Sequence, residues 1–204
     1  MTLRATSFCL LMLAIGGCGG AGSTGSTLPQ EAPTPENLYP LGQGYAWSYD
    51  VDTGTGLNSL YIARVVSVAG NRFEVTTGGE PTFYERRPEG IFRPASQTWL
   101  IKSPIEVGEE WPSDAGRTAR IASVTASVDV PEGHFDHCVE IVESGNDDGR
   151  SIHTTYCQNV GPVLVDSTQE IQITGRTLHV VAKLRGHSFG EAVESPDEVD
   201  APNQ

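Results

Sequence analysis

The feature that most constrains this chain is an alternation of apolar and polar residues with a period of two. Tyr45, Trp47, Tyr49 and Val51 alternate with small or acidic residues. This pattern is typical of a half-buried β-strand whose aromatic side chains face inward. A second series with the same period comprises Val124, Ala126, Val128 and Val130. No stretch combines a 3.6-residue apolar period with helix caps, so the pattern predicts β-structure with little helix.

A turn signal separates two of the apolar series at residues 70–71, where the sequence is Gly-Asn. A two-residue turn there pairs Val68 with Phe73. The next pair in the same register is Val66 with Val75, so four apolar side chains fall on one face. This segment therefore predicts a β-hairpin.

The same reasoning applies to Gly-Arg at residues 175–176. A two-residue turn at this point pairs Ile173 with Leu178 and, one step further, Ile171 with Val180. Glycine at the first turn position suits a type II′ turn, because that position needs a positive φ. We expect a second hairpin here.

The composition agrees with a turn-rich domain. The 204 residues include 23 glycines and 13 prolines. Glycine and proline together therefore make up a larger share of this chain than their usual combined share of about 12 %. The chain is long enough to bury one substantial core. We predict an all-β fold, a single antiparallel and strongly curved sheet of about ten strands that forms a half-barrel or open barrel.

The charge limits the partners. The chain has 13 basic and 26 acidic residues and a formal net charge of -13. A protein that binds the phosphate backbone needs a basic face. We therefore expect no nucleic-acid partner.

The first 18 residues have the pattern of an export signal. A short cationic start precedes a mainly apolar stretch of eleven residues at 5–15, too short to cross a hydrocarbon core that needs about 20. The sequence Ile-Gly-Gly-Cys that ends at Cys18 resembles the lipobox of bacterial lipoproteins. That resemblance implies a signal peptide of residues 1–17, acylation of Cys18 with palmitate as one acyl group, and location at the outer membrane. The alternative is an ordinary cleaved signal that happens to precede a cysteine.

Composition also divides the rest of the chain. Residues 18–37 are small, polar and punctuated by proline, which predicts a flexible tether with a reach of about 25 Å. Residues 190–204 carry five acids and no basic residue, which predicts a disordered acidic tail. The β-domain is expected to span residues 38–189. Its membrane partner would be reached through the N-terminal lipid.

Two cysteines of the expected domain flank a turn sequence, Gly-Asn-Asp-Asp-Gly at residues 145–149. Pairing Cys138 with Cys157 centres a hairpin on that turn and sets Val139 opposite Tyr156. Directly opposed residues in a non-hydrogen-bonded pair lie close enough for a disulfide, and an exported chain meets an oxidising compartment. We predict this disulfide, with two free buried thiols as the alternative.

Four short segments share a further pattern: LYPLG at 38–42 with WSY at 47–49, VGEEW at 107–111, VPEGHF at 130–135 with Cys138, and YCQNVGPV at 156–163. They resemble the YPL..G..W.Y, VG..W, VP.G.F..C and Y..GVG.V elements of a family of uncharacterised bacterial lipoproteins. Asn159 and Pro162 depart from that pattern. The family is distantly similar to LolA/LolB-like lipoprotein carriers, which implies a concave apolar face able to hold an acyl chain.

Signals for chemistry are weak. Residues 186–190 match G-x-S-x-G, but no histidine follows Ser188 to complete a triad. A group of metal-ligand residue types comprises His134, Asp136, His137 and Cys138. Neighbouring positions of a strand point to opposite faces, which argues against convergence on one ion. We predict no catalytic residue, no metal site and no cofactor.

The combined interpretation is a lipid-anchored, non-enzymatic lipoprotein of the bacterial cell envelope. Its curved sheet would bind a hydrophobic ligand such as a lipid, or an envelope protein, with Tyr45, Trp47 and Tyr49 lining the concave face. The alternative role for these aromatic residues is core packing. The alternative functions are a structural or surface-display module without a small-molecule ligand and, third, an enzyme.

Overall fold

The computed structural model describes residues 31–54, 56, 58–145, 149–171, 173 and 175–190. All of them except Glu31 belong to one compact unit, Ala32–Gln204. Cys18, the expected signal peptide and the acidic tail after Gly190 lie outside the described residues, so these assignments stay predictions. Among the described helices, none has the length and apolar character needed to span a membrane.

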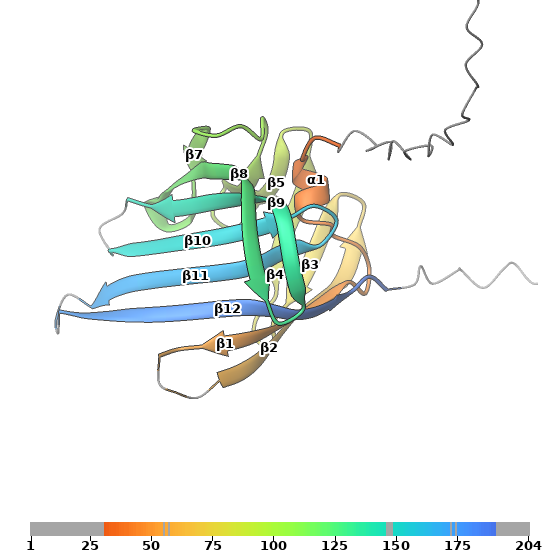
Figure 1. The fold of residues 1–204 in the computed structure, drawn as a ribbon. Helices are drawn as coiled ribbons and strands as arrows, with labels where there is room; N and C mark the ends of the chain where they lie inside the picture. Colours follow the sequence, from red (N-terminus) through yellow and green to blue (C-terminus); the bar gives the residue numbers. More distant parts are fainter. Residues whose placement is uncertain are drawn as a thin grey trace, which may run out of the picture. The chain divides into compact units, whose positions relative to one another are not determined.

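Twelve antiparallel strands form one sheet that nearly closes into a barrel (Figure 1). The strands are β1 (Ala46–Asp52), β2 (Asn58–Ala69), β3 (Arg72–Thr76), β4 (Thr82–Arg87), β5 (Gly90–Arg93), β6 (Thr98–Lys102), β7 (Glu110–Pro112), β8 (Thr118–Val130), β9 (Gly133–Ser144), β10 (Arg150–Cys157), β11 (Gly161–Ile171) and β12 (Arg176–Ser188). Their order is β6-β5-β4-β3-β2-β1-β12-β11-β10-β9-β8-β7. Strands β1 to β6 pair with their neighbours along the chain, and so do β7 to β12; β1 also pairs with β12, while β6 and β7 are the two ends of the sheet. The predicted all-β fold with a single curved antiparallel sheet is confirmed, with twelve strands instead of about ten.

A one-turn helix, α1 (Pro35–Leu38), precedes the first strand. Thr34 caps it: its side chain accepts a hydrogen bond from the backbone N–H of Asn37, whose own side chain accepts one from the backbone N–H of Thr34. Leu38 is fully buried, and α1 contacts β5 and β11. Residues 35–37, which the sequence placed in the tether, are therefore part of this helix.

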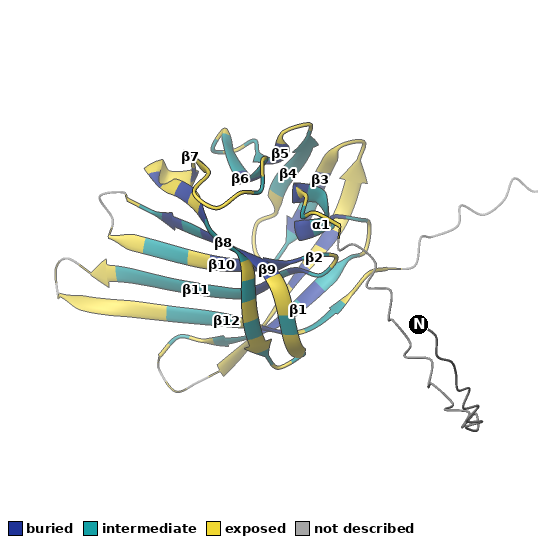
Figure 2. Ribbon diagram, turned by 45° about the horizontal axis from the view of Figure 1, so that its top comes forward, coloured by how far each residue is buried: buried dark blue, intermediate teal, exposed yellow. Residues whose placement is uncertain are grey.

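The core lies on the inner face of the sheet (Figure 2). Alternate residues of the strands supply it, in keeping with the period of two in the sequence. The largest side chains that are almost completely buried are Trp47, Leu38, Ile91, Ile101, Ile121, Ile141 and Leu184. They come from both halves of the strand order, so one core holds the whole sheet together.

The hairpin at residues 70–71 forms, and Val68 faces Phe73 as predicted. The second predicted pair is wrong. The register shifts between Val65 and Ser67, and Val75 pairs with Val65. The bulge turns Val66 outward, where it is 39 % exposed, and lets the fully buried Val65 take the core position.

The register of the β11–β12 hairpin also differs from the expectation. Ile171 pairs with Arg176, and Leu178 pairs with Gln169. The backbone N–H of Gly175 donates to the carbonyl oxygen of Ile171 at 2.8 Å, which closes a wider turn. Gly175, with φ of 62°, is the last residue of this turn and not the first. Both predicted pairs are therefore wrong, and Ile173, which is 97 % exposed, lies in the turn. Because the register differs by an even number of residues, Ile171, Leu178 and Val180 still share one side of the sheet.

The β9–β10 hairpin has the register that the sequence predicted. Val139 faces Tyr156, and Ile141 faces Thr154. Cys138 and Cys157 are joined by a disulfide, with their Cα atoms 4.4 Å apart. The predicted pairing of these two cysteines is confirmed.

The tip of the β8–β9 hairpin crosses strands β10 to β12 (Figure 1). Its turn docks on β12, where the backbone N–H of Glu132 donates to the carbonyl oxygen of Leu184 at 3.1 Å. The Glu132 carboxylate also lies 2.7 Å from Nδ1 of His187. This hairpin therefore straps one side of the sheet.

Candidate functional site

Two of the three aromatic residues proposed to line a concave binding face are packed in the core. Trp47 and Tyr49 are 1 % and 5 % exposed. The indole N–H of Trp47 donates to the carbonyl oxygen of Val160 at 2.6 Å, and the Tyr49 hydroxyl donates to the carbonyl oxygen of Pro162 at 2.8 Å. Both polar atoms are satisfied within the protein, as expected of buried aromatic side chains.

Tyr45, the third of these residues, lies nearer the surface. Its ring packs on Phe189 with 4.5 Å between centroids. It also covers Gly42, where a Cβ would come within 2.7 Å of the tyrosine ring. The Tyr45 ring thus leaves little space for a side chain at position 42.

The interior contains a cluster of buried tyrosines. Tyr39 lies between Trp47, Tyr84 and Tyr156, at centroid distances of 5.5, 5.7 and 6.4 Å. Burial raises the pKa of all three tyrosines above the ordinary value. Their hydroxyls therefore stay protonated, and their rings pack together in this part of the barrel.

A hollow of about 560 Å³ lies at one end of the barrel. It is lined by Thr82, Phe83, Tyr84, Arg93, Ala95, Ser96, Asp114, Arg117, Glu143, Arg150 and Ile152. These residues come from β4, β5, β9, β10, the turn between β5 and β6, and the segment between β7 and β8. Its volume falls in the range of about 300–1,000 Å³ that is usual for small-molecule sites.

A buried ion pair lies in the wall of this hollow. Nη2 of Arg93 donates to Oε1 of Glu143 at 3.3 Å, and Nη1 donates to Oε2 at 3.4 Å. Nη1 also donates to Oγ of Ser113 at 3.2 Å, and that hydroxyl donates to the Glu143 carboxylate. The two charged side chains are only 17 % and 8 % exposed. Burial works against the charge of Arg93, but the carboxylate outweighs it and raises the pKa of the guanidinium.

Strand parity explains why these charges point inward. Glu143 continues the inward series of Val139 and Ile141 on β9, and Arg93 follows the buried Ile91 on β5 by two residues. A charged residue at a position where the alternation predicts an inward-facing apolar side chain can be recognised in the sequence. Our prediction of site residues did not use this signal. Neither residue was among the predicted site residues.

Two further arginines line the same hollow. Arg117 is 6 % exposed and lies two residues before the fully buried Ala119 of β8. The loop that carries it is closed by hydrogen bonds between Ser113 and Arg117 and between Arg117 and Asp114. Arg150 begins β10, and its Nε donates to Oγ of Ser167 on β11 at 3.2 Å. Backbone hydrogen bonds therefore order the loop at Arg117, and a side-chain hydrogen bond holds the guanidinium group of Arg150.

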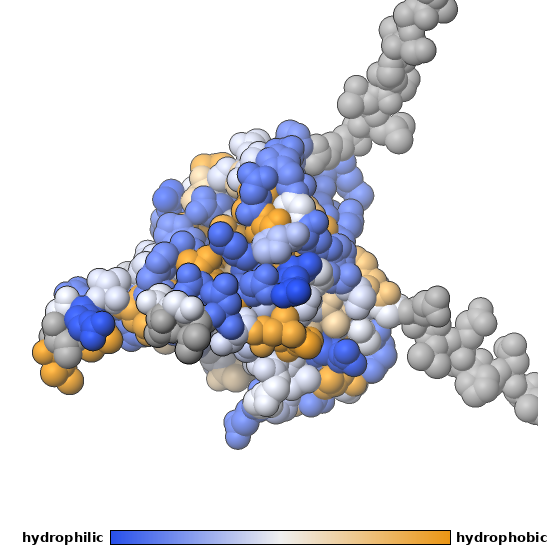
Figure 3. All heavy atoms as spheres, turned by 60° about the horizontal axis from the view of Figure 1, so that its bottom comes forward, coloured by the Kyte–Doolittle hydropathy of each residue, from blue (hydrophilic) through white to orange (hydrophobic). Residues whose placement is uncertain are grey.

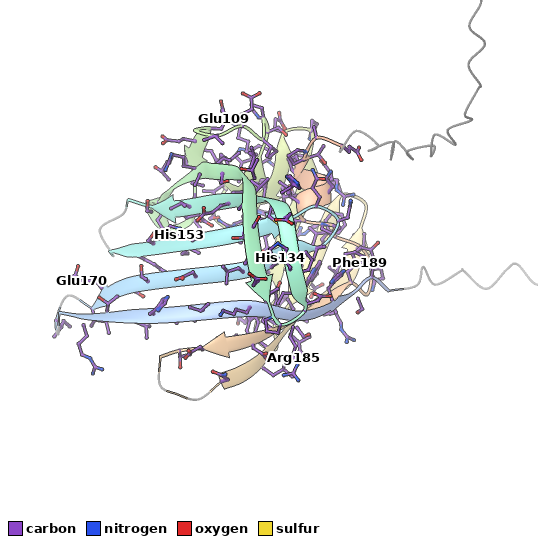
Figure 4. The ribbon with its side chains drawn as sticks, in the orientation of Figure 1. Glu109, His134, His153, Glu170, Arg185 and Phe189 are labelled. Atoms are coloured by element: carbon purple, nitrogen blue, oxygen red, sulfur yellow. A yellow bond between two sulfur atoms is a disulfide. The ribbon has the colours of Figure 1, made fainter. Side chains whose placement is uncertain are left out.

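A second hollow, of about 360 Å³, contains two histidine–carboxylate pairs. His153 lies 3.0 Å from Glu140, and His179 lies 2.8 Å from Asp166; Figure 4 labels His153 on β10. In the described part of the chain, no three side chains of His, Cys, Asp or Glu are arranged to hold a metal ion. These side chains are joined in pairs across neighbouring strands.

The other motifs have structural places. Ser188 of the G-x-S-x-G match is the last residue of β12 and pairs with Ala46. His134 lies in the β8–β9 hairpin (Figure 4) beside Asp129 and Asp136, at 2.8 and 3.2 Å. On the face drawn in Figure 3, apolar residues form separate groups among hydrophilic ones. The hollow around Arg93 is thus the strongest candidate site among the described residues.

Comparison with known proteins gives little further guidance. No family model matches the chain, and no curated protein matches it. Among solved structures, it is similar to an exported protein with a YmcC-like fold from Bacteroides fragilis, at 11 % identity and a TM-score of 0.41, over 74 % of this chain and 98 % of that one. It is also similar to a lipoprotein from Parabacteroides distasonis, at 11 % identity and a TM-score of 0.35, with the same coverage. At these values neither structure says what this chain does, and the LolA/LolB resemblance stays a prediction.

Proposed function

We propose that this chain is a lipid-anchored, non-enzymatic lipoprotein of the bacterial cell envelope that binds a small molecule in the hollow at one end of its barrel. The observation that supports this is the contrast within the barrel. Aromatic rings fill the interior around Tyr39, whereas the end near Arg93 is hollowed to about 560 Å³. Binding is therefore assigned to the hollow and not to the Trp47 face.

The lining suits a ligand with an apolar part. Phe83 on β4 and Ile152 on β10 contribute hydrocarbon surface, and Ala95 adds a small side chain. Burial of apolar ligand surface against such residues contributes about 25 cal/mol per Å². This retains the hydrophobic ligand expected from the sequence, but in a site that also holds charge.

The polar cluster does not favour catalysis. Both oxygens of the Glu143 carboxylate already accept hydrogen bonds, from Arg93 and Ser113. The hydroxyl of Ser113 donates to that same carboxylate. The cluster therefore has the arrangement of a satisfied structural network around a binding site.

Filling the hollow tests the proposal. Thr82 lines it from an exposed position on β4, so Thr82→Trp should block it without disturbing the core. Thr177→Trp, at an exposed position of β12 away from the hollow, is the matched control. Native mass spectrometry of the mature protein purified from envelope extracts should show a bound small molecule for the native chain and Thr177→Trp, and none for Thr82→Trp. Absence of any bound molecule from the native chain would favour the structural or surface-display module.

The anchor is tested separately. Metabolic labelling with palmitate should mark the native chain and not Cys18→Ser, and only the native chain should remain with membranes after a high-salt wash. Labelling of the variant would contradict acylation at Cys18. Protease added to intact cells should spare the domain if it faces the periplasm and should cleave it if it is displayed on the surface.

A further inference from the structure

Strand β2 has one edge without a partner strand over half of its length. It pairs with β1 from Asn58 to Arg64, but on its other side it pairs with β3 only from Arg64 to Ala69. Among the described residues, no strand pairs with residues Asn58–Ala63 on that side. Figure 1 shows this part of β2 beside β1 at the lower border of the view. We call it the free edge of β2.

The alternation of backbone groups shows which residues present this edge. The backbone N–H of Val65 donates to the carbonyl oxygen of Tyr45 at 2.8 Å, on the β1 side of β2. Successive residues of an antiparallel strand direct their backbone groups to opposite sides, so Tyr61 bonds toward β1, whereas Leu60 and Ile62 direct theirs away from it. In the described part of the chain, no backbone group meets those of Leu60 and Ile62 on that side. Another β-strand is the partner that satisfies such a row of donors and acceptors.

The side chains of the free edge are apolar and exposed. Leu60 and Ile62 are 61 % and 46 % exposed on the outer face of the sheet. Tyr61 is 44 % exposed on the inner face, opposite the buried Tyr49. Natural edge strands are usually protected from pairing by a lysine, a proline or a bulge. The free edge has no charged residue and no proline, and the bulge of β2 lies beyond it, at Val66. It is therefore suited to pairing.

Charge favours a second copy of this chain as the partner. Each copy has a formal net charge of -13, so two copies repel unless they meet where like charges are absent. The free edge is uncharged. One of its ends is followed by Arg64, and its other end, Asn58, lies opposite Asp52 of β1. Arg64 and Asp52 are both exposed, on the same face of the sheet. When two such edges pair antiparallel, Arg64 of each copy approaches Asp52 of the other.

We propose that the free edge of β2 pairs with the free edge of a second copy, antiparallel about a two-fold axis. Leu60 and Ile62 of the two copies pack on one face of the joined sheet, and Tyr61 packs on the other. Because both copies use the same residues, the contact closes as a dimer. Strand β3 occupies the edge from Arg64 onward, so the new ladder is short and the dimer is weak. This inference goes beyond the proposed function and does not depend on a ligand in the hollow.

Sedimentation velocity and amide hydrogen exchange test the dimer. Both use the compact unit Ala32–Gln204, which contains all the strands, α1 and the disulfide. As concentration rises, the sedimentation coefficient should shift from that of a monomer to that of a dimer. The amides of Leu60 and Ile62 should then exchange more slowly, by about tenfold or more. The amides of Tyr61 and Ala63, which bond to β1, should exchange at the same rate at every concentration.

Edge variants locate the contact. Leu60→Lys puts a lysine of each copy into the shared ladder and should abolish the dimer. Val107→Lys is the matched control, because Val107 is 60 % exposed and lies between β6 and β7. Ile62→Pro is a second variant, which removes an amide donor that points away from β1. The circular dichroism spectrum and the disulfide are checked in each variant to show that it folds.

Every outcome decides the inference. A dimer that is lost in Leu60→Lys and Ile62→Pro and retained in Val107→Lys supports pairing through β2. A monomer at every concentration, with fast exchange at Leu60 and Ile62, would overturn it. A dimer that persists in both edge variants would overturn it as well, because the copies would then meet elsewhere. None of these results depends on what the hollow binds, so the proposed function is judged separately, by Thr82→Trp.

Discussion

The indole N–H of Trp111 on β7 donates to the carbonyl oxygen of Trp99 on β6, with 3.1 Å between the two atoms. These strands are the two ends of the sheet, and no ladder of backbone hydrogen bonds joins them among the described residues. Trp111 is 3 % exposed, so its N–H has little access to water. A side chain thus connects edges that the backbone leaves unpaired, which also covers two strand edges.

Trp111→Phe should loosen this seam. The change removes one buried hydrogen bond and leaves the Trp99 carbonyl without that donor, which should lower the free energy of unfolding by about 1–2 kcal/mol. Urea denaturation measures the loss. Amide hydrogen exchange should become faster in β6 and β7 only. Trp47→Phe removes a similar hydrogen bond far from the seam and should leave amide exchange in β6 and β7 unchanged. Equal acceleration of exchange in β6 and β7 by the two variants would contradict the closing role of Trp111.

Gly161 should tolerate no side chain. It has φ of 109°, and a Cβ would lie 2.8 Å from Nε1 of the buried Trp47. Gly161→Ala should therefore destabilise the protein by about 2–4 kcal/mol, from backbone strain and crowding. Gly175→Ala is the control, since Gly175 also has positive φ but open space around it, and it should cost only about 1 kcal/mol. Similar midpoints of thermal unfolding for both variants would show that Trp47 can move aside.

The ion pair between Arg93 and Glu143 should show strong coupling. Glu143→Ala leaves a largely buried guanidinium without its carboxylate, which should cost about 3–5 kcal/mol. The double variant Arg93→Met with Glu143→Leu should lose much less, because neither charge is then buried alone. Urea denaturation of Arg93→Met, Glu143→Leu and the double variant completes the cycle. Additive losses would show that the two side chains do not act together.

The disulfide determines how many cysteine thiols can react with a labelling reagent before and after reduction. Cys138 and Cys157 are joined across β9 and β10 at a sequence separation of 19. Thiol labelling of the oxidised unit Ala32–Gln204 should therefore find no free thiol, and both cysteines should react after reduction. The chain-entropy model gives a loss of about 3 kcal/mol on removing a crosslink of this span. The double variant Cys138→Ala with Cys157→Ala should show this loss in denaturation, and it should no longer respond to reductant.

His134 should titrate above the ordinary histidine value. The hydrogen bond to Asp129 and the charge of Asp136 raise its pKa. Because the pKa is raised in the folded state, the pairing stabilises the hairpin below the ordinary histidine pKa, and the stabilisation is lost as pH rises through the folded-state pKa. NMR titration of the imidazole measures it. Asp129→Asn should lower the pKa, whereas Asp166→Asn, beside His179, should leave it unchanged; an equal response to both would contradict the local cause.

The sequence predicted the elements whose register depends on local pattern. The alternation around Trp47 and Tyr49 placed their side chains inward correctly. The disulfide register followed from a turn lying midway between Cys138 and Cys157. In each case residues close in the sequence carry the necessary information, because the strand period and the turn chemistry are local properties.

Other features depend on contacts that the pattern does not contain. The bulge at Val66 puts Val65 in the core, where it contacts side chains of strands that the local pattern does not specify. Arg93 and Glu143 are distant in sequence, so only the closed sheet shows that their inward positions meet. The hollow could not be predicted for the same reason. Its lining comes from strands whose spacing follows from the curvature of the barrel.

The strand order has a mechanical meaning. Strands β1 to β6 form one half of the barrel and β7 to β12 the other, each half a run of consecutive strands. The halves share the β1–β12 ladder on one side and meet at the Trp111–Trp99 seam on the other. The ion pair from Arg93 to Glu143 spans from the first half to the second. The two halves are thus joined by a backbone ladder on one side and by a single side-chain hydrogen bond on the other. We therefore expect them to separate at the Trp111–Trp99 seam before they separate at the ladder.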